Sequence, residues 1–317
     1  MGAQIKAFET AASMEELLAL LHDAQVVPGW AKREPSLYAR PKESFVPAHW
    51  SYEMGKAALD SAGKYVSTEH AERRNLILYN PVPGNDYASV KSLVAAYQMV
   101  LAGETAVSHR HTANALRLVM DAGPKAYTVV DGKKIPMLPG DVLLTPNWSW
   151  HGHANESDRK AYWIDFLDVP LVHFLEPMFF ESWSGGLQET SVVDERSPMR
   201  FAFEQTVARL DAAPESQPGE RVIELGPPKI DTMALYVSRL KGGGRFTAGR
   251  TTANSILAVI QGRGSSNVGG TNIEWSRGDV FVVPSWRTHD YRANEDSYLL
   301  RVTDEPVVKL FNWLRKG

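Results

Sequence analysis

Short apolar stretches separated by glycine and proline turns run through most of the chain. They predict strands at 72–81, 90–101, 115–119, 142–145 and 161–167, with another strand that begins at His151. Asp131-Gly132 is a type I′ hairpin signal, and Pro139-Gly140-Asp141 marks a second turn. Short strands at such regular spacing are typical of a β-sandwich or a β-barrel, so we expect a mainly β protein.

Helical patterns are confined to the N-terminus and a few later segments. Ser13-Met14-Glu15-Glu16 fits a capping box, and the leucines that follow have helical spacing up to Pro28. The segment 29–50, rich in proline and aromatic residues, is expected to be an ordered arm packed on a barrel or on a neighbouring subunit. Further helices are predicted at 54–61, 170–183 and 203–210.

The hydrophobic pattern repeats once. Gly140-Asp-Val-Leu-Leu-Thr-Pro-Asn-Trp-Ser-Trp-His151 recurs as Gly278-Asp-Val-Phe-Val-Val-Pro-Ser-Trp-Arg-Thr-His289. A repeat of this kind predicts a second copy of the same barrel. We therefore divide the chain into an N-terminal helix and arm (1–70), a first barrel (71–183), a connection (184–226) and a second barrel (227–317).

Composition excludes several kinds of function. The 317 residues contain 44% hydrophobic and 22% charged residues, as in ordinary globular proteins, and the net charge of −3 gives no electrostatic reason to expect nucleic acid as a partner. Cysteine is absent, which excludes disulfides and thiolate metal sites. Since there is no signal-peptide pattern and no apolar run of about 18 residues, we expect a cytoplasmic protein without membrane contact.

The histidines predict a metal site in the first barrel. His109 and His111, two residues apart on a strand, point to the same face, and Gly103 precedes them at the spacing of a first cupin motif. Gly140, Pro146, His151 and Asn155 have the spacing of the second cupin motif. We predict that His109, His111 and His151 bind a metal ion and leave positions open for other ligands.

The second copy lacks these ligands. An offset of 140 residues places Gly249 where the first copy has His109, Thr251 where it has His111, and Leu257 where it has Arg117. His289 alone corresponds to a ligand, namely His151. One imidazole is not a catalytic metal site, so we expect His289 to be a structural histidine and the second barrel to hold no metal.

Several strings together resemble the gentisate 1,2-dioxygenase family, which includes salicylate and 1-hydroxy-2-naphthoate dioxygenases. The resemblance is dense from Arg73 to Leu171 and is carried by His109-Arg-His-Thr-x-x-Ala-Leu-Arg117, Val130-Asp-Gly, Pro139-Gly-Asp, Thr145-Pro-x-Trp-x-Trp-His-x-His-x-Asn155 and Trp163-x-Asp-x-Leu-Asp-x-Pro-Leu171. It implies a bicupin of two double-stranded β-helix (jelly-roll) barrels. It also implies one Fe(II) per chain in the first barrel, a homotetramer, and ring cleavage by O2 between the carboxyl-bearing and hydroxyl-bearing carbons.

The resemblance also assigns roles around the metal. Thr112 to Leu116 contains no glutamate, so the site is a neutral histidine triad that leaves an ion its full charge and favours a chelating aromatic carboxylate beside O2. Arg117, on the same strand parity as the ligands, is expected to hold the substrate carboxylate; the alternative is an arginine between strands. His153 is expected to bind substrate or oxygen-derived groups and to move protons, with Asp165 orienting it; the alternative for both is a structural contact.

Other candidates line the expected pocket. Of Arg73 and Arg74 only one can face inward, and the resemblance favours Arg73. Gln98 matches a pocket glutamine of the family, and Trp148 stands where many cupins have glycine. Val94 replaces an aromatic residue that family members often carry, which reshapes the pocket and makes a 5-substituted salicylate, such as 5-nitrosalicylate, as plausible a substrate as gentisate.

Two other classes of function stay open at this stage. One is a cupin isomerase or decarboxylase that uses Mn or Zn. The other is a cupin that binds or stores a ligand without catalysis, because the second barrel shows that ligands have been lost within this chain. The absent glutamate and the Ala115-Leu116-Arg117 string favour the dioxygenase.

Overall fold

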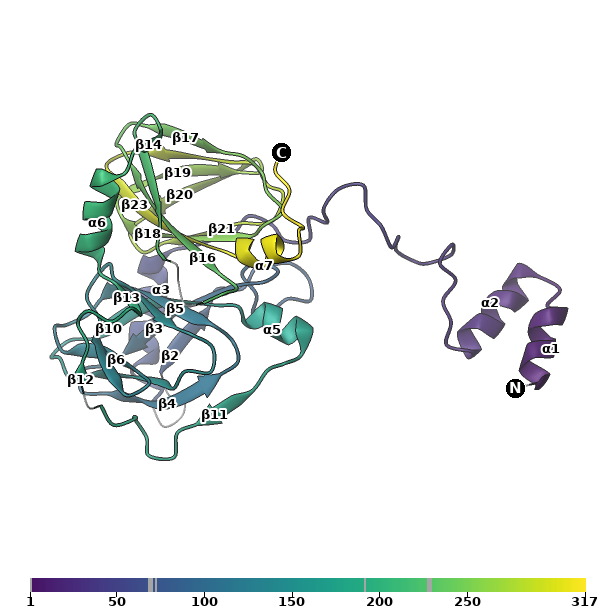
Figure 1. Cartoon of the computed structure of the whole chain (residues 1–317), viewed down its shortest axis with the longest axis horizontal. Helices are drawn as coiled ribbons and strands as arrows, with labels where there is room; N and C mark the ends of the chain where they lie inside the picture. Colours follow the sequence, from purple (N-terminus) through teal and green to yellow (C-terminus); the bar gives the residue numbers. More distant parts are fainter. Residues whose placement is uncertain (1, 68–70, 72, 191, 227–229) are drawn as a thin grey trace. The chain divides into compact units, whose positions relative to one another are not determined.

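The computed structural model describes residues 2–67, 71, 73–190, 192–226 and 230–317 (Figure 1). The chain divides into two compact units, Met1–Lys42 and Glu43–Gly317. The first residue of the strand predicted at 72–81 lies outside the described residues, as does His70. Among the described residues, no helix has the length and apolar character needed to cross a membrane.

The first unit contains two short helices, α1 (Gly2–Thr10) and α2 (Met14–Asp23). The capping signal works as predicted, because the backbone N–H of Glu16 donates to Ser13 Oγ at 3.0 Å. The carboxylate of Glu16 in turn accepts from the N–H of Ala12 at 2.8 Å. Helix α2 ends five residues before Pro28, and residues 24–42 form turns and irregular backbone.

The first barrel consists of two facing sheets. One has the order β13-β8-β5-β10-β3-β2 and the other β11-β4-β9-β6-β7-β12. The strands are β2 (Arg74–Ile77), β3 (Val94–Val100), β4 (Thr105–His111), β5 (Ala115–Asp121), β6 (Ala126–Val130), β7 (Lys133–Pro136), β8 (Val142–Thr145), β9 (His151–Asn155), β10 (Ala161–Leu167), β11 (Phe180–Ser182), β12 (Val192–Val193) and β13 (Arg200–Phe201). The hairpin at Asp131-Gly132 has both residues at positive φ, 47° and 76°, as a type I′ turn requires.

The second barrel repeats this arrangement with sheets β1-β21-β18-β23-β16-β15-β14 and β17-β22-β19-β20. Its strands are β1 (His49–Trp50), β14 (Glu215–Gln217), β15 (Glu220–Glu224), β16 (Ala234–Leu240), β17 (Arg245–Ala248), β18 (Ser255–Gln261), β19 (Arg263–Val268), β20 (Thr271–Ser276), β21 (Val280–Val283), β22 (His289–Ala293) and β23 (Ser297–Thr303). Helices α3 (Tyr52–Ala62), α5 (Val169–Leu175), α6 (Phe203–Ala212) and α7 (Glu305–Leu310) complete the second unit. The mainly β fold with two barrels is as predicted.

Strand alternation assigns each side chain of the first barrel to one of two environments. On β10, Trp163 packs with Val119 and Leu143 inside the barrel. The intervening residues Ile164 and Phe166 face outward and join one large cluster with outward residues of β16, β18, β21 and β23 of the second barrel. The two barrels therefore share a core between them, while the interior of each remains available for its own contents.

One of the predicted helices is too long. The helix predicted at 170–183 stops at Leu175, because Glu176 adopts a left-handed conformation (φ 70°) and Pro177 follows it. Residues 180–182 then form β11, which pairs with β4 alongside His109 and His111.

The polar range 184–226, which we assigned to a connection, contains β14 and β15 of the second barrel as well as α6. Strand β1, which we placed in the arm, pairs with β21 of the second barrel. Strands β1 and β14 span only two and three residues, fewer than the roughly four to eight over which an alternating pattern can be recognised. The second barrel thus takes strands from outside 227–317.

Candidate metal centre

Three histidines from two neighbouring strands meet inside the first barrel. His109 on β4 lies directly opposite His151 on β9, and their rings are 4.4 Å apart. The ring of His111 is 4.9 Å from that of His151. One nitrogen from each of the three residues lies within 4.8 Å of the others, which is the arrangement that three ligands of one ion require.

Backbone carbonyls fix which nitrogen of each ring can bind a metal. His111 Nδ1 lies 2.7 Å from the carbonyl oxygen of Ala113, and His151 Nδ1 lies 3.0 Å from that of Ser149. His109 Nδ1 has a longer contact of 3.4 Å with the carbonyl of Val107. A carbonyl oxygen only accepts, so each Nδ1 carries the proton and each Nε2 keeps its lone pair. The sequence thus folds the triad into the tautomer that a metal needs.

The environment also keeps the triad neutral. Burial lowers the pKa of His109 to about 3, and the nearby positive charge of Arg73 acts in the same direction. Burial likewise lowers the pKa of His111 and holds the pKa of His151 well below its usual range. Three neutral nitrogens without a carboxylate fit a divalent first-row transition ion, which imidazole prefers to bind.

Beside the triad lies a chain of buried polar side chains. Arg117 is 1% exposed and donates to Asp165 Oδ1 at 3.3 Å. The amide of Gln98 donates to Asp165 Oδ2 at 2.6 Å, and Gln98 Oε1 accepts from Arg73 Nε. The strand register brings these side chains together, because Asp165 on β10 lies opposite Arg117 on β5 and opposite Ala96 on β3. Asp165 therefore compensates the buried guanidinium and orients Gln98.

Of the two adjacent arginines, the structure brings Arg73 to the site and not Arg74. The charge of Arg73 contributes to lowering the pKa of His109, His111 and His153. Arg74 is buried on the other side, where it forms an ion pair with Glu104 and donates to the carbonyl of Val66. Arg74 thus has a structural position, and the inclusion of Arg74 among the substrate-binding candidates does not agree with the structure.

His153 presents an unsatisfied donor to the interior. Its Nδ1 lies 3.4 Å from Arg117 Nη1, which can only donate, so the imidazole proton resides on Nε2. That Nε2 is buried and has no hydrogen-bond partner in the part of the chain that the structure describes, and the same holds for Trp163 Nε1, whose ring is 5.0 Å away. Burial and the charge of Arg117 hold the pKa of His153 well below its usual range, so the ring is neutral. Buried N–H groups without acceptors are the expected state of a site that awaits a ligand.

The remaining candidates lie at different depths. Val94 is buried on β3 with the same strand parity as Gln98, so it faces the interior of the barrel. Trp148 is 38% exposed and lies at the rim, where the Arg110 guanidinium is 4.5 Å from its ring and Phe179 is 6.2 Å away. Its φ of 61° explains why many cupins have glycine at this position.

The sequence pattern did not identify several residues that complete the site. Thr128 and Thr145 accept from Arg117 at 2.8 Å and 3.0 Å and so fix its guanidinium from the opposite side to Asp165. Phe180 on β11 packs its ring 5.3 Å from that of His109. Thr145 belongs to a string that we quoted for the family resemblance, which was a usable signal. Phe180 had none, because we expected a helix there.

Comparisons with known proteins agree with this geometry. Residues 96–169 match the family model of the cupin domain. The chain is 31% identical to gentisate 1,2 dioxygenase 1 of Aquipseudomonas alcaligenes, with 96% of each chain covered. It is 32% identical to 5-aminosalicylate 1,2-dioxygenase of Comamonas sp, over 92% of this chain and 87% of that one. Salicylate 1,2-dioxygenase from Pseudoaminobacter salicylatoxidans, solved as an adduct with gentisate, superposes with a TM-score of 0.89 at 25% identity, over 97% of this chain and 94% of that one.

Proposed function

The chain belongs to the gentisate 1,2-dioxygenase family of ring-cleaving dioxygenases, and from this premise we propose that it is an Fe(II) enzyme that opens the ring of gentisate or of a 5-substituted salicylate. Cleavage takes place between the ring carbon that bears the carboxylate and the one that bears the hydroxyl. Both atoms of O2 enter the ring-opened product, so the reaction needs no external reductant.

The observation that carries the proposal is the combination of a preformed triad with an adjacent cationic wall. His109, His111 and His151 direct three lone pairs to one point, and Arg73 and Arg117 place positive charge beside it. An aromatic 2-hydroxy acid has a carboxylate next to a phenolic oxygen, so it can meet both features at once. When bound at the triad, Fe(II) would supply the electrons that activate O2 and a Lewis acid for the substrate oxygens.

Arg117, Arg73 and His153 have distinct tasks in this proposal. Arg117 already donates to Asp165, Thr128 and Thr145, so we assign it mainly a positioning and electrostatic role. Arg73, whose Nε donates to Gln98 Oε1, would orient the substrate carboxylate. The Nε2–H of His153 would donate a hydrogen bond to an oxygen atom of substrate or of O2 as negative charge develops there. Exclusion of water by the buried wall strengthens each of these contacts.

Val94 is the position from which we derive the substituted substrate. A valine on the inward face of β3 leaves more space than an aromatic ring, and Ala96 next to it on the same face adds to that space. We therefore propose that the pocket accommodates a substituent on the ring at the 5-position of a salicylate. The relative that acts on 5-aminosalicylate supports a substrate of this class.

A substrate panel tests the proposal. Iron-loaded protein is mixed with gentisate, salicylate, 5-aminosalicylate, 5-nitrosalicylate or 1-hydroxy-2-naphthoate while oxygen uptake and the ultraviolet spectrum are recorded. We expect one mole of O2 consumed per mole of substrate and a new ring-fission chromophore with at least one of the five. Absence of turnover with all of them would refute the proposed substrate class.

Metal identity and assembly are tested on the same protein. Reconstitution of metal-free protein with Fe(II), Mn(II) or Zn(II) separates a dioxygenase from an isomerase or decarboxylase, because only iron should restore oxygen uptake. We expect one iron per chain. The homotetramer and the cytoplasmic location remain predictions, and light scattering of the purified protein tests the first of them.

A further inference from the structure

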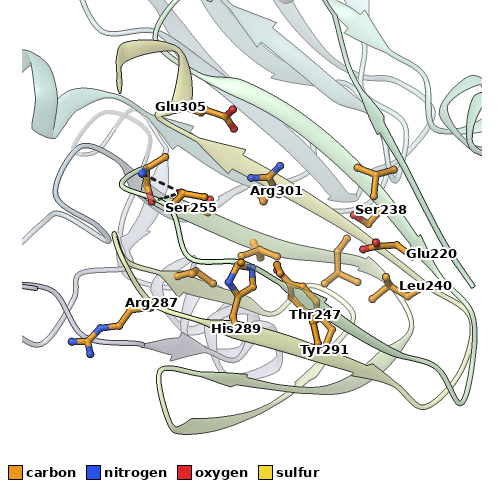
Figure 2. Close-up of a pocket in the computed structure, with 18 of the residues that line it drawn as sticks. Glu220, Ser238, Leu240, Thr247, Ser255, Arg287, His289, Tyr291, Arg301 and Glu305 are labelled. Atoms are coloured by element: carbon orange, nitrogen blue, oxygen red, sulfur yellow. Dashed lines mark hydrogen bonds between the residues drawn. The ribbon is translucent and has the colours of Figure 1, made fainter. Parts of the chain in front are cut away.

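The second barrel contains a cavity of about 240 Å³ at the place where the first barrel holds its metal site (Figure 2). The cavity is lined by strands β15 to β18 and β21 to β23, and His289, the counterpart of His151, lies on its wall. Its volume is slightly below the roughly 300–1,000 Å³ that is usual for sites of drug-sized ligands. A molecule no larger than a single substituted ring therefore fits the space.

An arginine without an ion pair points into this cavity. Arg301 on β23 takes the place of Asp165, because it lies opposite Leu257 as Asp165 lies opposite Arg117. The second barrel thus has the cation Arg301 but not an acidic partner like Asp165, which pairs with Arg117 in the first barrel. Within the described part of the chain, no carboxylate forms an ion pair with Arg301, and its guanidinium lies 4.3 Å from the ring of Tyr236. A half-buried guanidinium in that condition favours an anion.

Figure 2 shows Arg301 between Glu305 and His289 on the wall of the cavity. The carboxylate of Glu305 pairs with Lys309 at 2.7 Å. Burial together with the charge of Arg301 lowers the pKa of His289 to about 4, so the His289 ring is neutral at pH 7. The hydroxyls of Ser238 and Thr247 also line the cavity. Neither the neutral His289 ring nor these hydroxyls compete with a bound carboxylate for the positive charge of Arg301.

A hydrogen-bond acceptor, the carboxylate of Glu220, lies elsewhere on the wall of the same cavity. Glu220 on β15 is 8% exposed, and the two hydrogen bonds that it receives, from Ser216 and Gln217, both end on Oε2 at 2.7 Å. Oε1 therefore has no donor among the described residues. Glu220 and Arg301 line one cavity and form no ion pair with each other. The cavity is thus polarised, with a cation at one position and a hydrogen-bond acceptor at another.

From this arrangement we propose that the second barrel is a binding site for a small monocarboxylate that carries a hydroxyl or amino group away from the carboxylate. Arg301 binds the carboxylate, Glu220 Oε1 accepts from the hydroxyl or amine, and the side chains of Leu257 and Leu299 contact the apolar body of the ligand. A second carboxylate at the Glu220 end is repelled, so dicarboxylates are excluded. The site lies in the other barrel from the triad and does not depend on ring cleavage.

The test uses 3-hydroxybenzoate and 4-hydroxybenzoate, with terephthalate as a dicarboxylate of similar size. Neither hydroxybenzoate has the adjacent hydroxyl needed for chelation at the triad. Binding is measured by isothermal titration calorimetry with iron-loaded wild type and iron-loaded Arg301→Gln, and with His111→Ala, which is expected to lack the iron. Arg263→Gln is the control, because this exposed arginine of the same barrel pairs with Glu295 at the surface.

We expect at least one hydroxybenzoate to bind wild type, Arg263→Gln and His111→Ala alike, and to bind Arg301→Gln at least tenfold more weakly. Equal affinity for Arg301→Gln, or loss of binding in His111→Ala, would overturn the proposal, since the ligand would then occupy another site. Glu220→Gln provides a second readout that does not rely on Arg301: it should admit terephthalate, which wild type rejects. Rejection of terephthalate by both proteins would contradict the role of Glu220.

Discussion

The two barrels share a scaffold and differ in what the scaffold encloses. In the first, the backbone N–H of Asn114 donates to the Asp168 carboxylate at 2.8 Å; in the second, the backbone N–H of Asn254 donates to the Asp304 carboxylate at 2.7 Å. The counterpart tryptophans Trp148 and Trp286 both adopt positive φ, 61° and 65°. The backbone N–H of Trp148 donates to the carbonyl of His111. The backbone N–H of Trp286 donates to the carbonyl of Thr251, the residue that corresponds to His111.

The interior positions have diverged while these contacts persisted. Where the first barrel has His111, Arg117 and Asp165, the second has Thr251, Leu257 and Arg301. The shared contacts are backbone hydrogen bonds in buried turns, whose loss leaves unsatisfied groups and lowers stability whatever the barrel binds. Interior side chains have no such constraint, so one scaffold encloses a histidine triad in one copy and a polarised cavity in the other.

The largest expected effect is on metal content. If the triad of the first barrel is the metal site, His111→Ala should lower bound iron from one per chain to nearly zero. Ring cleavage should fall by at least about 1,000-fold, the order found when one member of a catalytic unit is removed. Iron is measured by elemental analysis and turnover by oxygen uptake.

The matched control is His173→Ala, which removes an exposed histidine of α5 that contacts only the ring of Tyr87 among the aromatic residues described. It should keep one iron per chain and normal turnover. If His111→Ala instead retained iron, the second barrel would have to hold metal, and the contrast between the barrels would fail.

The next largest effect concerns buried charge, because the first barrel has Asp165 at the position where the second has Arg301. Asp165→Asn leaves the fully buried Arg117 without its counter-charge, and breaking a buried pair of this kind costs about 3–5 kcal/mol of the free energy of unfolding. We also expect kcat/KM to fall about 10- to 100-fold, because Arg117 and Gln98 lose their common partner. In the second barrel, Arg301→Gln breaks no ion pair and should cost less than about 1 kcal/mol.

Denaturant unfolding of both variants, with iron present, measures this difference. A loss of stability in Arg301→Gln as large as that in Asp165→Asn would mean that the Arg301 charge is already compensated within the fold. Equal turnover of wild type and Asp165→Asn would remove Asp165 from the positioning network.

The contrast also separates what sequence could predict from what it could not. The histidine cluster and the repeat were accessible because they depend on local spacing: two histidines two residues apart share a strand face in any register. The fold class followed from the same short periodic strands. The placement of Arg73 rather than Arg74 agreed with an expectation taken from family resemblance, whereas local patterning alone required only that one of them face inward.

Features that depend on long-range pairing were not predictable. Phe180 reaches His109 only because β11 pairs with β4, and the apolar run around it fitted a helix equally well. The position of Arg301 opposite Leu257 required the register of β18 and β23, which a sequence offset of 140 in one strand and 136 in another does not reveal. Strand register is set by the whole sheet, so a single strand carries little information about its partners.

The shared scaffold predicts effects of equal size in the two barrels. Asp168→Ala removes the acceptor of the Asn114 backbone N–H, of its side-chain amide at 3.2 Å and of Thr232 Oγ1 at 2.5 Å. Asp304→Ala removes the corresponding bonds to Asn254 at 2.7 Å and 2.8 Å. Each should lower the free energy of unfolding by about 1–3 kcal/mol, the cost of leaving buried donors unsatisfied.

Urea unfolding of the two alanine variants gives the comparison directly, with Asp158→Ala, an exposed surface carboxylate, as the control that should change little. A cost confined to Asp168→Ala would show that the second barrel does not depend on this turn, and the idea of a common scaffold would need to be limited to the first barrel.

The smallest effect is a difference in acid stability that arises in the second barrel alone. Burial, helped by the charge of Arg301 and opposed by that of Asp290, lowers the pKa of His289 from 6.5 to about 4. The unfolded chain therefore binds a proton that the folded chain resists between these two values, so stability is complete above pH 6.5, falls as the pH is lowered and levels off near pH 4. Because His289 is partly exposed, we expect a contribution of about 1–2 kcal/mol rather than the full shift.

His289→Asn removes this titration and leaves the triad histidines in place. Their acid response is common to both proteins, so it cancels when the free energy of unfolding of wild type is compared with that of the variant at each pH. The stability difference, wild type minus variant, should decrease by about 1–2 kcal/mol from pH 7 to pH 4 and stay constant above pH 7. A difference that is flat across the whole range would mean that His289 titrates normally in the folded protein, and hence that the second cavity is more open to water than the first.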